Sequence, residues 1–197
     1  MPLFESGLPQ VVFYILYLSL FVGVVGGAFS TGRRDKVNPG RVKAKYGRKD
    51  SIGLTLTPFI SLFLSLWFGY YSVGLLPSWS YYLGITLSIL GVMLSVWAVR
   101  TLGRYMTFGV TIYNDQKVVK GGPYRFVRHP VYTASFLIFT GMGFAVQSWL
   151  AALMIAIWFA ASVAYRLVHE EKALVASLGE EYISYSRRVK RFIPFIF

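Results

Sequence analysis

Residues 51–99 have the sequence SIGLTLTPFISLFLSLWFGYYSVGLLPSWSYYLGITLSILGVMLSVWAV, in which no aspartate, glutamate, lysine or arginine occurs. A helix needs roughly 20 apolar residues to cross a bilayer. The 49 residues of this stretch are therefore enough for two such helices. Leu76-Pro77-Ser78 interrupts the stretch with a turn signal. We expect two membrane-spanning helices joined by a short loop at this point.

Two further segments, 6–32 and 129–165, also lack these four residue types. The first is long enough for one span, at about residues 9–29, and the second divides near Gln147-Ser148 into two short spans. Hydrophobic residues make up 55% of the 197-residue chain and aromatic residues 18%, which is too apolar for an ordinary soluble domain. We therefore expect an all-α integral membrane fold with five transmembrane helices.

The basic residues test this topology. Of the twenty lysines and arginines, eight lie in 33–49, six in 100–128 and six in 166–191. Five alternating spans place these three regions on the same side of the membrane. Since short cytoplasmic loops carry an excess of Lys and Arg, we expect the N-terminus outside and the C-terminus in the cytoplasm.

The first predicted span has one competing interpretation, a cleavable signal peptide. Gly26-Gly27-Ala28 resembles a small-residue cleavage site. However, no positive charge precedes the apolar run, whereas signal peptides carry one there. We therefore expect residues 9–29 to be retained as a span.

The net charge of +12 raises the question of nucleic-acid binding. The basic loop 33–49 has neither aromatic platforms nor a recognisable nucleic-acid-binding fold, so no nucleic-acid partner is predicted. Each cation near a membrane surface contributes about 1 kcal/mol of attraction to anionic lipids. We expect this loop to determine topology and to bind anionic lipid headgroups.

The chain contains no cysteine and only two histidines, His129 and His169. The lack of cysteine excludes disulfides, thiolate zinc sites and a cysteine nucleophile. No metal site is predicted. Each histidine lies in a polar segment next to a predicted span, and these two segments are the candidates for a functional site.

The first polar segment, 121–132, has the sequence GGPYRFVRHPVY. Gly121 and Gly122 permit backbone conformations that other residues avoid, and Pro123 then fixes its own φ angle. Pro130 is expected at the first position of a helix, where its missing N–H costs nothing. The positive end of that helix, with Arg128 and Arg125 beside it, is expected to bind an anion, although anchoring at the membrane surface would use the same residues.

The second polar segment lies at the end of the last predicted span. Arg166, His169 and Glu170 have i, i+3, i+4 spacing, so we expect them on one helix face. The hairpin formed by the last two spans brings this face close to Arg128-His129. The two polar segments are therefore predicted to form one site.

A further amphipathic helix is expected after Leu178-Gly179, a plausible helix end. Glu180-Glu181 suit the first turn of such a helix and Arg187-Arg188 its last turn. Tyr182 and Tyr185 share one face of it, and such pairs usually pack rather than bind ligands.

These segments together resemble the isoprenylcysteine carboxyl methyltransferase family, and more broadly the integral-membrane methyltransferases that include phospholipid N-methyltransferases. The resemblance covers roughly residues 100–197. The residues that carry it are Gly122-Pro123-Tyr124, Arg128-His129-Pro130-Val131-Tyr132, Arg166, Glu170-Glu171, Gly179-Glu180-Glu181-Tyr182, Tyr185 and Arg191-Phe192-Ile193-Pro194.

The resemblance implies S-adenosylmethionine as methyl donor, in a cytoplasmic pocket formed by the C-terminal half. Residues implied as cofactor-binding are Gln116, Lys117, Val118, Val119, Tyr124, His129, Pro130, Val131, Tyr132 and Glu170. Arg166 is implied as the acceptor-binding arginine, and Arg166 and Arg128 as the catalytic side chains. The connection before Gln116 is shorter than in eukaryotic members of the family. Cofactor contacts that those members make upstream of this position are therefore not assigned to this chain.

Several chemical classes of methyl acceptor fit the predicted site. A carboxylate is already a nucleophile at neutral pH, and Arg166 is suited to hold it bidentately. An amine or a thiol needs deprotonation, for which His169 and Glu171 are the candidates. We expect carboxyl O-methylation of a prenylcysteine-like acceptor reaching the site from the bilayer. Phospholipid amine N-methylation and thiol S-methylation are the alternatives.

Two other functional classes of membrane protein share sequence features with this chain. An NADPH-dependent membrane reductase has a comparable Arg-His-Pro-x-Tyr element, and the basic loop 33–49 alone is consistent with a non-catalytic lipid-binding protein. The short loops favour a prokaryotic cell membrane over the endoplasmic reticulum. We expect residues 1–99 to supply the N-terminal spans and residues 100–197 the catalytic region.

Overall fold

The computed structural model describes residues 42–46, 52–107 and 110–192, together with Val11, Phe13, Ile15, Tyr17 and Leu18. Its helices are α2 (Ile52–Tyr70), α3 (Trp79–Leu102), α4 (Pro130–Ala145), α5 (Trp149–Leu178) and α6 (Glu180–Arg188). Two strands, β1 (Val42–Tyr46) and β2 (Val110–Tyr113), and two 3-10 helices, η3 (Gly103–Tyr105) and η4 (Gly122–Arg125), complete it. Most of the predicted span 9–29 and most of the basic loop 33–49 lie outside the described residues.

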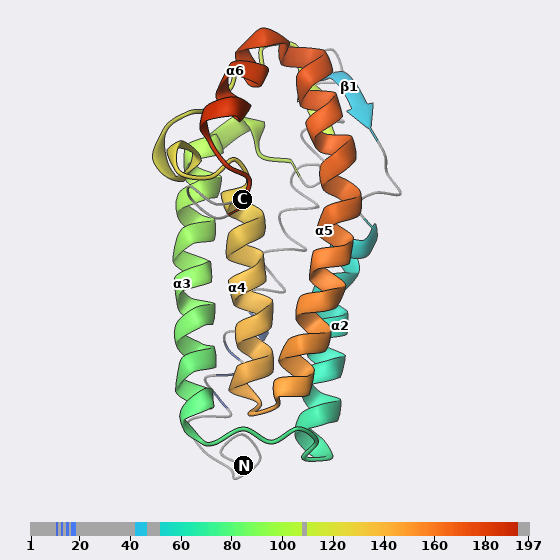
Figure 1. The fold of residues 1–197 in the computed structure, drawn as a ribbon, viewed down its shortest axis with the longest axis vertical. Helices are drawn as coiled ribbons and strands as arrows, with labels where there is room; N and C mark the ends of the chain where they lie inside the picture. Colours follow the sequence, from blue (N-terminus) through green and yellow to red (C-terminus); the bar gives the residue numbers. More distant parts are fainter. Residues whose placement is uncertain are drawn as a thin grey trace.

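The four long helices run side by side, and α6 covers one end of the bundle (Figure 1). The helix breaks fall where the sequence predicts them: α2 and α3 are separated around Leu76-Pro77-Ser78, and α4 and α5 at Gln147-Ser148. Ser148 caps α5, because its Oγ accepts a hydrogen bond of 3.2 Å from the Ala151 N–H. Helix α6 begins directly after Gly179, as predicted.

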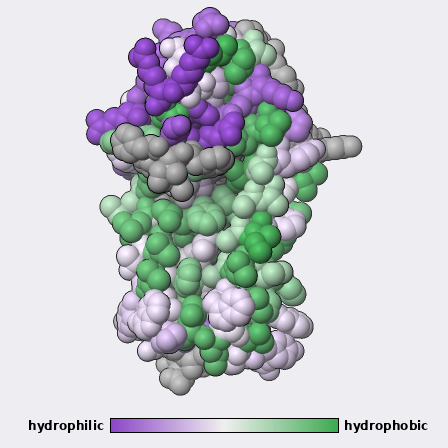
Figure 2. All heavy atoms as spheres, viewed as in Figure 1, coloured by the Kyte–Doolittle hydropathy of each residue, from purple (hydrophilic) through white to green (hydrophobic). Residues whose placement is uncertain are grey.

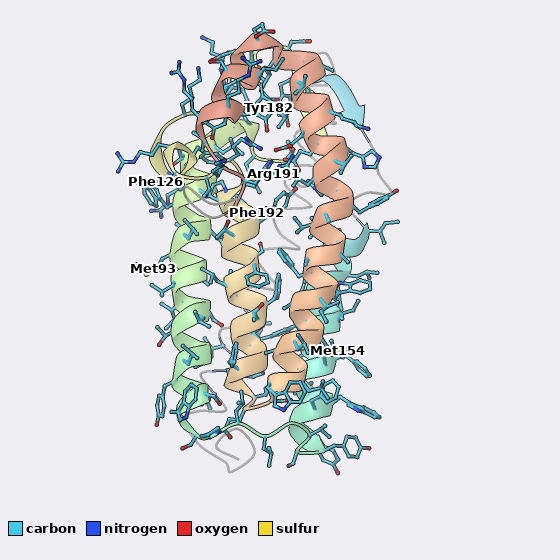
Figure 3. The ribbon with its side chains drawn as sticks, viewed as in Figure 1. Met93, Phe126, Met154, Tyr182, Arg191 and Phe192 are labelled. Carbon is cyan, nitrogen blue, oxygen red and sulfur yellow. The ribbon has the colours of Figure 1, made fainter. Side chains whose placement is uncertain are left out.

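Within the described residues, α2, the α3 region and α5 are long and apolar enough to cross a membrane, whereas α4 has only 16 residues. Large apolar side chains point outward from these helices, including Met93 and Met154 (Figure 3). Figure 2 shows an apolar surface over the length of the bundle and a hydrophilic surface at the end covered by α6. This distribution matches a bundle surrounded by lipid.

Small residues allow α3 and α4 to approach closely. A Cβ atom added at Gly84 would lie 2.3 Å from the backbone nitrogen of Ala145, and one added at Gly141 would lie 2.7 Å from the Gly84 carbonyl oxygen. Ser88 on α3 donates to the Ile138 carbonyl of α4 at 3.2 Å. Gly and Ser at a helix interface permit this kind of packing in membranes. The second half of α4 is therefore packed closely against the first half of α3.

Side chains from several helices fill the centre of the bundle. The buried apolar residues include Tyr81, Ile138, Phe139, Met142, Ile155, Phe159 and Val163. Phe13 and Tyr17 join them, and the Tyr17 hydroxyl donates to the Pro58 carbonyl of α2. This contact ties the N-terminal part of the chain to the bundle.

The all-α expectation missed a small sheet. β1 and β2 pair antiparallel, with Ala44 opposite Ile112 and Tyr46 opposite Val110. The run Val110–Tyr113 is rich in β-branched and aromatic residues, which favour strands.

The chain after α6 returns to the start of α4. The Arg128 N–H donates to the Lys190 carbonyl at 2.7 Å, and the His129 N–H donates to the Arg191 carbonyl at 3.1 Å. These backbone bonds fix the C-terminal segment against the residues that precede α4. Polar groups from 121–132, from the end of α5 and from α6 therefore lie together at one end of the bundle.

Candidate functional site

A cavity of about 220 Å³ lies at this end of the bundle, beside α6. All the residues that the resemblance implies as cofactor-binding, acceptor-binding or catalytic line it: Gln116, Lys117, Val118, Val119, Tyr124, Arg128, His129, Pro130, Val131, Tyr132, Arg166 and Glu170. They come from the loop after β2, from the start of α4 and from the end of α5. The structure thus brings together the two polar segments that the sequence analysis expected to meet.

The start of α4 is built as predicted. Pro130 occupies the first turn, and His129 precedes it with an extended φ of −123°. The His129 ring is buried and stacks on Tyr132 at 5.6 Å between ring centroids. His129 makes no side-chain hydrogen bond to the α4 backbone, so it does not cap the helix in the usual way. Its ring instead forms part of the cavity wall.

Tyr132, Arg166 and Glu170 form one group across the α4–α5 hairpin. The Tyr132 hydroxyl donates to Glu170 Oε2, and Arg166 Nε lies 3.4 Å from the same oxygen. The Arg166 guanidinium also lies over the Tyr132 ring, 5.9 Å from its centroid. Arg166 is only 6% exposed. A buried cation and its carboxylate partner therefore stand side by side on the cavity wall.

His169 was expected on the same helix face and is not found there. It is exposed, its ring packs on Tyr165, and its Nδ1 lies 3.0 Å from the Tyr165 carbonyl oxygen. Consecutive residues of a helix are 100° apart, so residues at i+3 and i+4 lie on either side of residue i. Glu170 faces the cavity together with Arg166, and His169 turns outward. The sequence analysis was wrong to place all three on one face.

Glu171, the other candidate base, is bound by two arginines and does not line the cavity. Its Oε1 accepts from Arg128 Nη2 at 2.9 Å, and its Oε2 accepts from Arg191 Nη2 at 2.8 Å. His129 Nε2 lies 3.3 Å from Oε1, and since an ionised carboxylate only accepts, that nitrogen carries a proton in this contact. Glu171 joins the start of α4 to the C-terminal segment.

Arg128 is therefore largely committed to the protein itself. Its Nη1 donates to the Ser186 carbonyl and, at 2.9 Å, to the Val189 carbonyl. Its Nη2 donates to Glu171. These contacts fix the guanidinium in the cavity wall. The sequence analysis, which expected Arg128 to bind an anion next to the helix, did not foresee this structural role.

Two tyrosines of α6, expected only to pack, also line the cavity. The Tyr185 hydroxyl donates to the Tyr124 carbonyl at 2.6 Å, and burial raises the pKa of Tyr185 to about 12. Burial, followed by the charge of Glu170, raises the pKa of Tyr124 above its ordinary value. Both hydroxyls remain protonated at neutral pH. The sequence signal was the presence of two aromatic residues on one face of a strongly polar helix.

The segment before Gln116, from the end of α3 through η3 to β2, contributes further lining residues that were not predicted from the sequence: Leu102, Tyr105, Met106, Thr107, Thr111 and Ile112. Tyr105 fixes this loop by donating to the Asp115 carbonyl at 2.8 Å. The Gln116 side chain accepts from the Tyr113 N–H at 3.1 Å, which closes the turn after β2. Pairing of β2 with β1 thus positions the wall that precedes Gln116.

The cavity also extends between the long helices. Its walls there are apolar and come from three helices: Leu54, Thr55 and Pro58 of α2, Ser135 and Phe139 of α4, and Phe159 of α5. Phe159 precedes Arg166 by seven residues, or roughly 10 Å along a helix. The cavity therefore has a polar end near Arg166 and Glu170 and an apolar arm that runs between the membrane-spanning helices. Within the described part of the chain, no cluster of His, Asp or Glu side chains is arranged to hold a metal ion.

Comparison with known protein families identifies the fold. The model of the phospholipid methyltransferase family matches residues 79–181, just over half of the chain. The chain belongs to that family. The match spans α3, α4, α5 and the start of α6, which supply most of the cavity. The resemblance to integral-membrane methyltransferases stated from the sequence is thereby confirmed.

The chain is also similar to proteins that carry the names of specific methyltransferases. The chain is 30% identical over 120 residues to protein-S-isoprenylcysteine O-methyltransferase B of Arabidopsis thaliana, covering 60% of this chain and 61% of that protein. It is 35% identical over 98 residues to methanethiol S-methyltransferase of Crocosphaera subtropica, covering 47% of this chain and 35% of that protein. The alignments thus cover less than two thirds of either relative.

A solved structure shares the fold over almost the whole chain. It is a eukaryotic intramembrane Ras methyltransferase, isoprenylcysteine carboxyl methyltransferase. The TM-score is 0.69, the sequence identity 20%, and the alignment covers 98% of this chain and 70% of that chain. At this identity the likeness supports the fold and leaves the substrate open.

Proposed function

We propose that the protein is an S-adenosylmethionine-dependent methyltransferase acting on a lipophilic acceptor that enters from the bilayer. The observation that carries the proposal is the two-part cavity. Its polar end is lined by residues implied to hold the donor, and its apolar arm lies between membrane-spanning helices. Family membership supplies the reaction class.

The residues present fit the proposed donor. S-adenosylmethionine carries a carboxylate, an amine, ribose hydroxyls and an adenine ring. Glu170 is suited to the amine or the hydroxyls, and the aromatic side chains Tyr124 and His129 offer flat surfaces to the rings. The loop 116–119 lines the same cavity. When bound, the donor would supply a methyl group from its sulfonium sulfur to an acceptor nucleophile aligned opposite the carbon–sulfur bond, and the neutral thioether of the donor would be the leaving group.

The acceptor is proposed to be a carboxylate, as in a prenylcysteine-like substrate. Arg166 is buried where the polar end meets the apolar arm, so it is suited to hold an anion whose tail occupies the arm. A carboxylate needs no general base. The two bases that an amine would require are absent from the cavity wall, since His169 faces outward and Glu171 is held by two arginines. Phospholipid amine methylation is therefore disfavoured.

Thiol S-methylation is the second candidate. One relative with 35% identity is named a methanethiol S-methyltransferase. A cation beside a thiol favours the thiolate, so Arg166 is suited to bind this acceptor in its anionic form without the general base that an amine needs. Carboxyl O-methylation and thiol S-methylation are distinguished by their products, because a methyl ester is labile to base and a thioether is not.

We further infer five membrane spans, with residues 9–29 as the first and α4 as a short span, and the site on the cytoplasmic side. The regions 100–128 and 166–191 at the cavity end each contain six lysines and arginines, whereas the opposite loops, 71–78 and 146–148, contain none. Exposed Tyr70, Trp79 and Tyr82 fit an aromatic belt at the outer interface. The basic loop 33–49 is proposed to bind anionic headgroups. The short loops favour a prokaryotic cell membrane.

Two measurements test the proposed reaction. Titration calorimetry of the detergent-purified protein should detect binding of S-adenosylmethionine and none of NADPH; the reverse result would favour a reductase. Membranes containing the protein are then incubated with methyl-labelled donor and treated with base. Release of labelled methanol indicates a methyl ester, whereas base-stable label in lipid or in a small thioether rules out the carboxylate acceptor.

A further inference from the structure

Unsatisfied polar atoms single out one part of the cavity wall. Among the described residues, the buried side-chain atoms without a hydrogen-bond partner are Ser65 Oγ, Ser80 Oγ, Thr140 Oγ1, Trp158 Nε1, Arg128 Nε and Tyr182 Oη. Of the residues that carry them, only Arg128 and Tyr182 line the cavity. A buried polar group without a partner lowers stability unless a ligand or water supplies one. Two such groups in one wall indicate a place where a ligand binds.

Both atoms are hydrogen-bond donors. The outer nitrogens of Arg128 contact Ser186, Val189 and Glu171, and Nε is the one nitrogen of this guanidinium without a partner among the described residues. Tyr182 is 5% exposed. Burial, followed by the charge of Glu171, raises the pKa of Tyr182, with Arg128 acting in the opposite direction. The hydroxyl therefore stays protonated at neutral pH and lies within the field of Arg128.

Tyr185 gives an internal comparison on the same helix. It lies one turn after Tyr182, lines the same cavity and is buried to a similar degree. Its hydroxyl is satisfied by the Tyr124 carbonyl. The chain thus provides a partner for one α6 tyrosine and none, within the described residues, for the other. Figure 3 shows Tyr182 with Arg191 at the end of the bundle where α6 covers α4.

The charges around this wall favour an anion. Arg128 and Arg191 bring two guanidinium groups to this part of the structure, and both contact the carboxylate of Glu171. The N-terminal end of α4, at Pro130, adds the positive end of its dipole. Two hydrogen-bond donors, one of them on a guanidinium, beside the positive end of a helix match a carboxylate better than an ammonium.

We propose that Tyr182 Oη and Arg128 Nε bind the carboxylate of S-adenosylmethionine, so that α6 is part of the donor site. This inference rests on the proposed function and specifies which end of the donor lies under α6. The amine is then directed to Glu170, the carboxylate on the α5 side of the cavity. Tyr182 becomes a binding residue in place of the packing role expected from the sequence.

The test compares two ligands in the Tyr182→Phe variant of the full chain in detergent. S-adenosylmethionine has the carboxylate, whereas its decarboxylated analogue keeps the amine, sulfonium and adenosine. We expect Tyr182→Phe to weaken S-adenosylmethionine binding about tenfold, as for a lost hydrogen bond to a charged group. The affinity for the decarboxylated analogue should be unchanged. Arg128 is left intact, because it also holds Glu171 and the C-terminal segment.

Tyr185→Phe is the matched control, since its hydroxyl is used by the protein. It should change the affinities for the two ligands by the same factor. Equal weakening of both ligands by Tyr182→Phe, or no weakening of either, would overturn the carboxylate assignment while leaving the proposed function intact. Failure of the unmodified protein to bind S-adenosylmethionine would overturn both. Size-exclusion profiles and thermal unfolding confirm that the variants are folded.

Discussion

Tyr132 donates its hydroxyl hydrogen to Glu170, which links the first turn of α4 to the end of α5. The two residues are 38 positions apart, and the link exists because the α4–α5 hairpin returns the chain to the same end of the bundle. Arg166 lies against both partners. One contact therefore fixes the wall between the proposed donor and acceptor sites.

Glu170→Gln should show how much the negative charge of this side chain contributes to donor binding, because glutamine has almost the same size and shape. Glutamine still accepts from Tyr132, so the fold should be retained, but the negative charge facing the donor is lost. We expect S-adenosylmethionine to bind at least about tenfold more weakly, as for a lost charge-assisted contact. Calorimetry measures the affinity, and an unchanged value would contradict the assigned role. Glu180→Gln, an exposed substitution at the start of α6, serves as the control.

Arg166→Lys should act on the acceptor more than on the donor. Lysine keeps the positive charge beside Glu170 but loses the planar fork that holds a carboxylate bidentately. We expect the acceptor KM to rise roughly tenfold, with the S-adenosylmethionine Kd within about twofold of the parent. Steady-state kinetics with a prenylcysteine-like acceptor provide the test. Arg125→Lys, which alters an exposed arginine stacked on Phe126, is the matched control. An acceptor KM equal to that of the control would exclude Arg166 from the acceptor site.

The sequence predicts the helices well because membrane spans are strong local signals. An uncharged run of apolar residues forms a helix regardless of its partners, and Pro130 and Gly179 mark helix boundaries by their own backbone chemistry. The grouping of Arg166 and Glu170 with the start of α4 also follows from topology alone, since alternating spans place both at the same membrane surface.

The remaining features depend on tertiary contacts that no local pattern encodes. The alternation of Val42, Ala44 and Tyr46 with lysines is a strand signal, but a strand needs a partner, and β2 lies beyond two long helices. His169 and Glu171 were ambiguous because helical spacing does not specify how the helix is rotated toward the cavity. Tyr182 and Tyr185 have the same pattern in the sequence, and only the structure shows that the Tyr185 hydroxyl has a partner and that the Tyr182 hydroxyl has none among the described residues.

The proposed topology can be tested directly, because the chain contains no cysteine. Ser78→Cys and Lys120→Cys each introduce one thiol at an exposed position, at opposite ends of the bundle. In intact cells, a membrane-impermeant maleimide should label Ser78→Cys alone. Lys120→Cys should become labelled only after the cells are permeabilised. Labelling of Lys120→Cys in intact cells would place the candidate site on the outer face.

Glu171→Gln should release the C-terminal segment from α4. The substitution leaves Arg128 and Arg191 without their shared carboxylate, and Arg128 is almost buried, so the free energy of unfolding should fall by about 2–4 kcal/mol. Trypsin should then cleave near Lys190 and Arg191 faster than in the parent. Glu181→Gln is the matched control, because Glu181 pairs with Lys120 at an exposed site, where such a bridge is worth less than about 1 kcal/mol. Equal thermal stability and equal cleavage rates in the two variants would mean that Glu171 does not hold the segment, and that α6 is fixed over the cavity by its tyrosines alone.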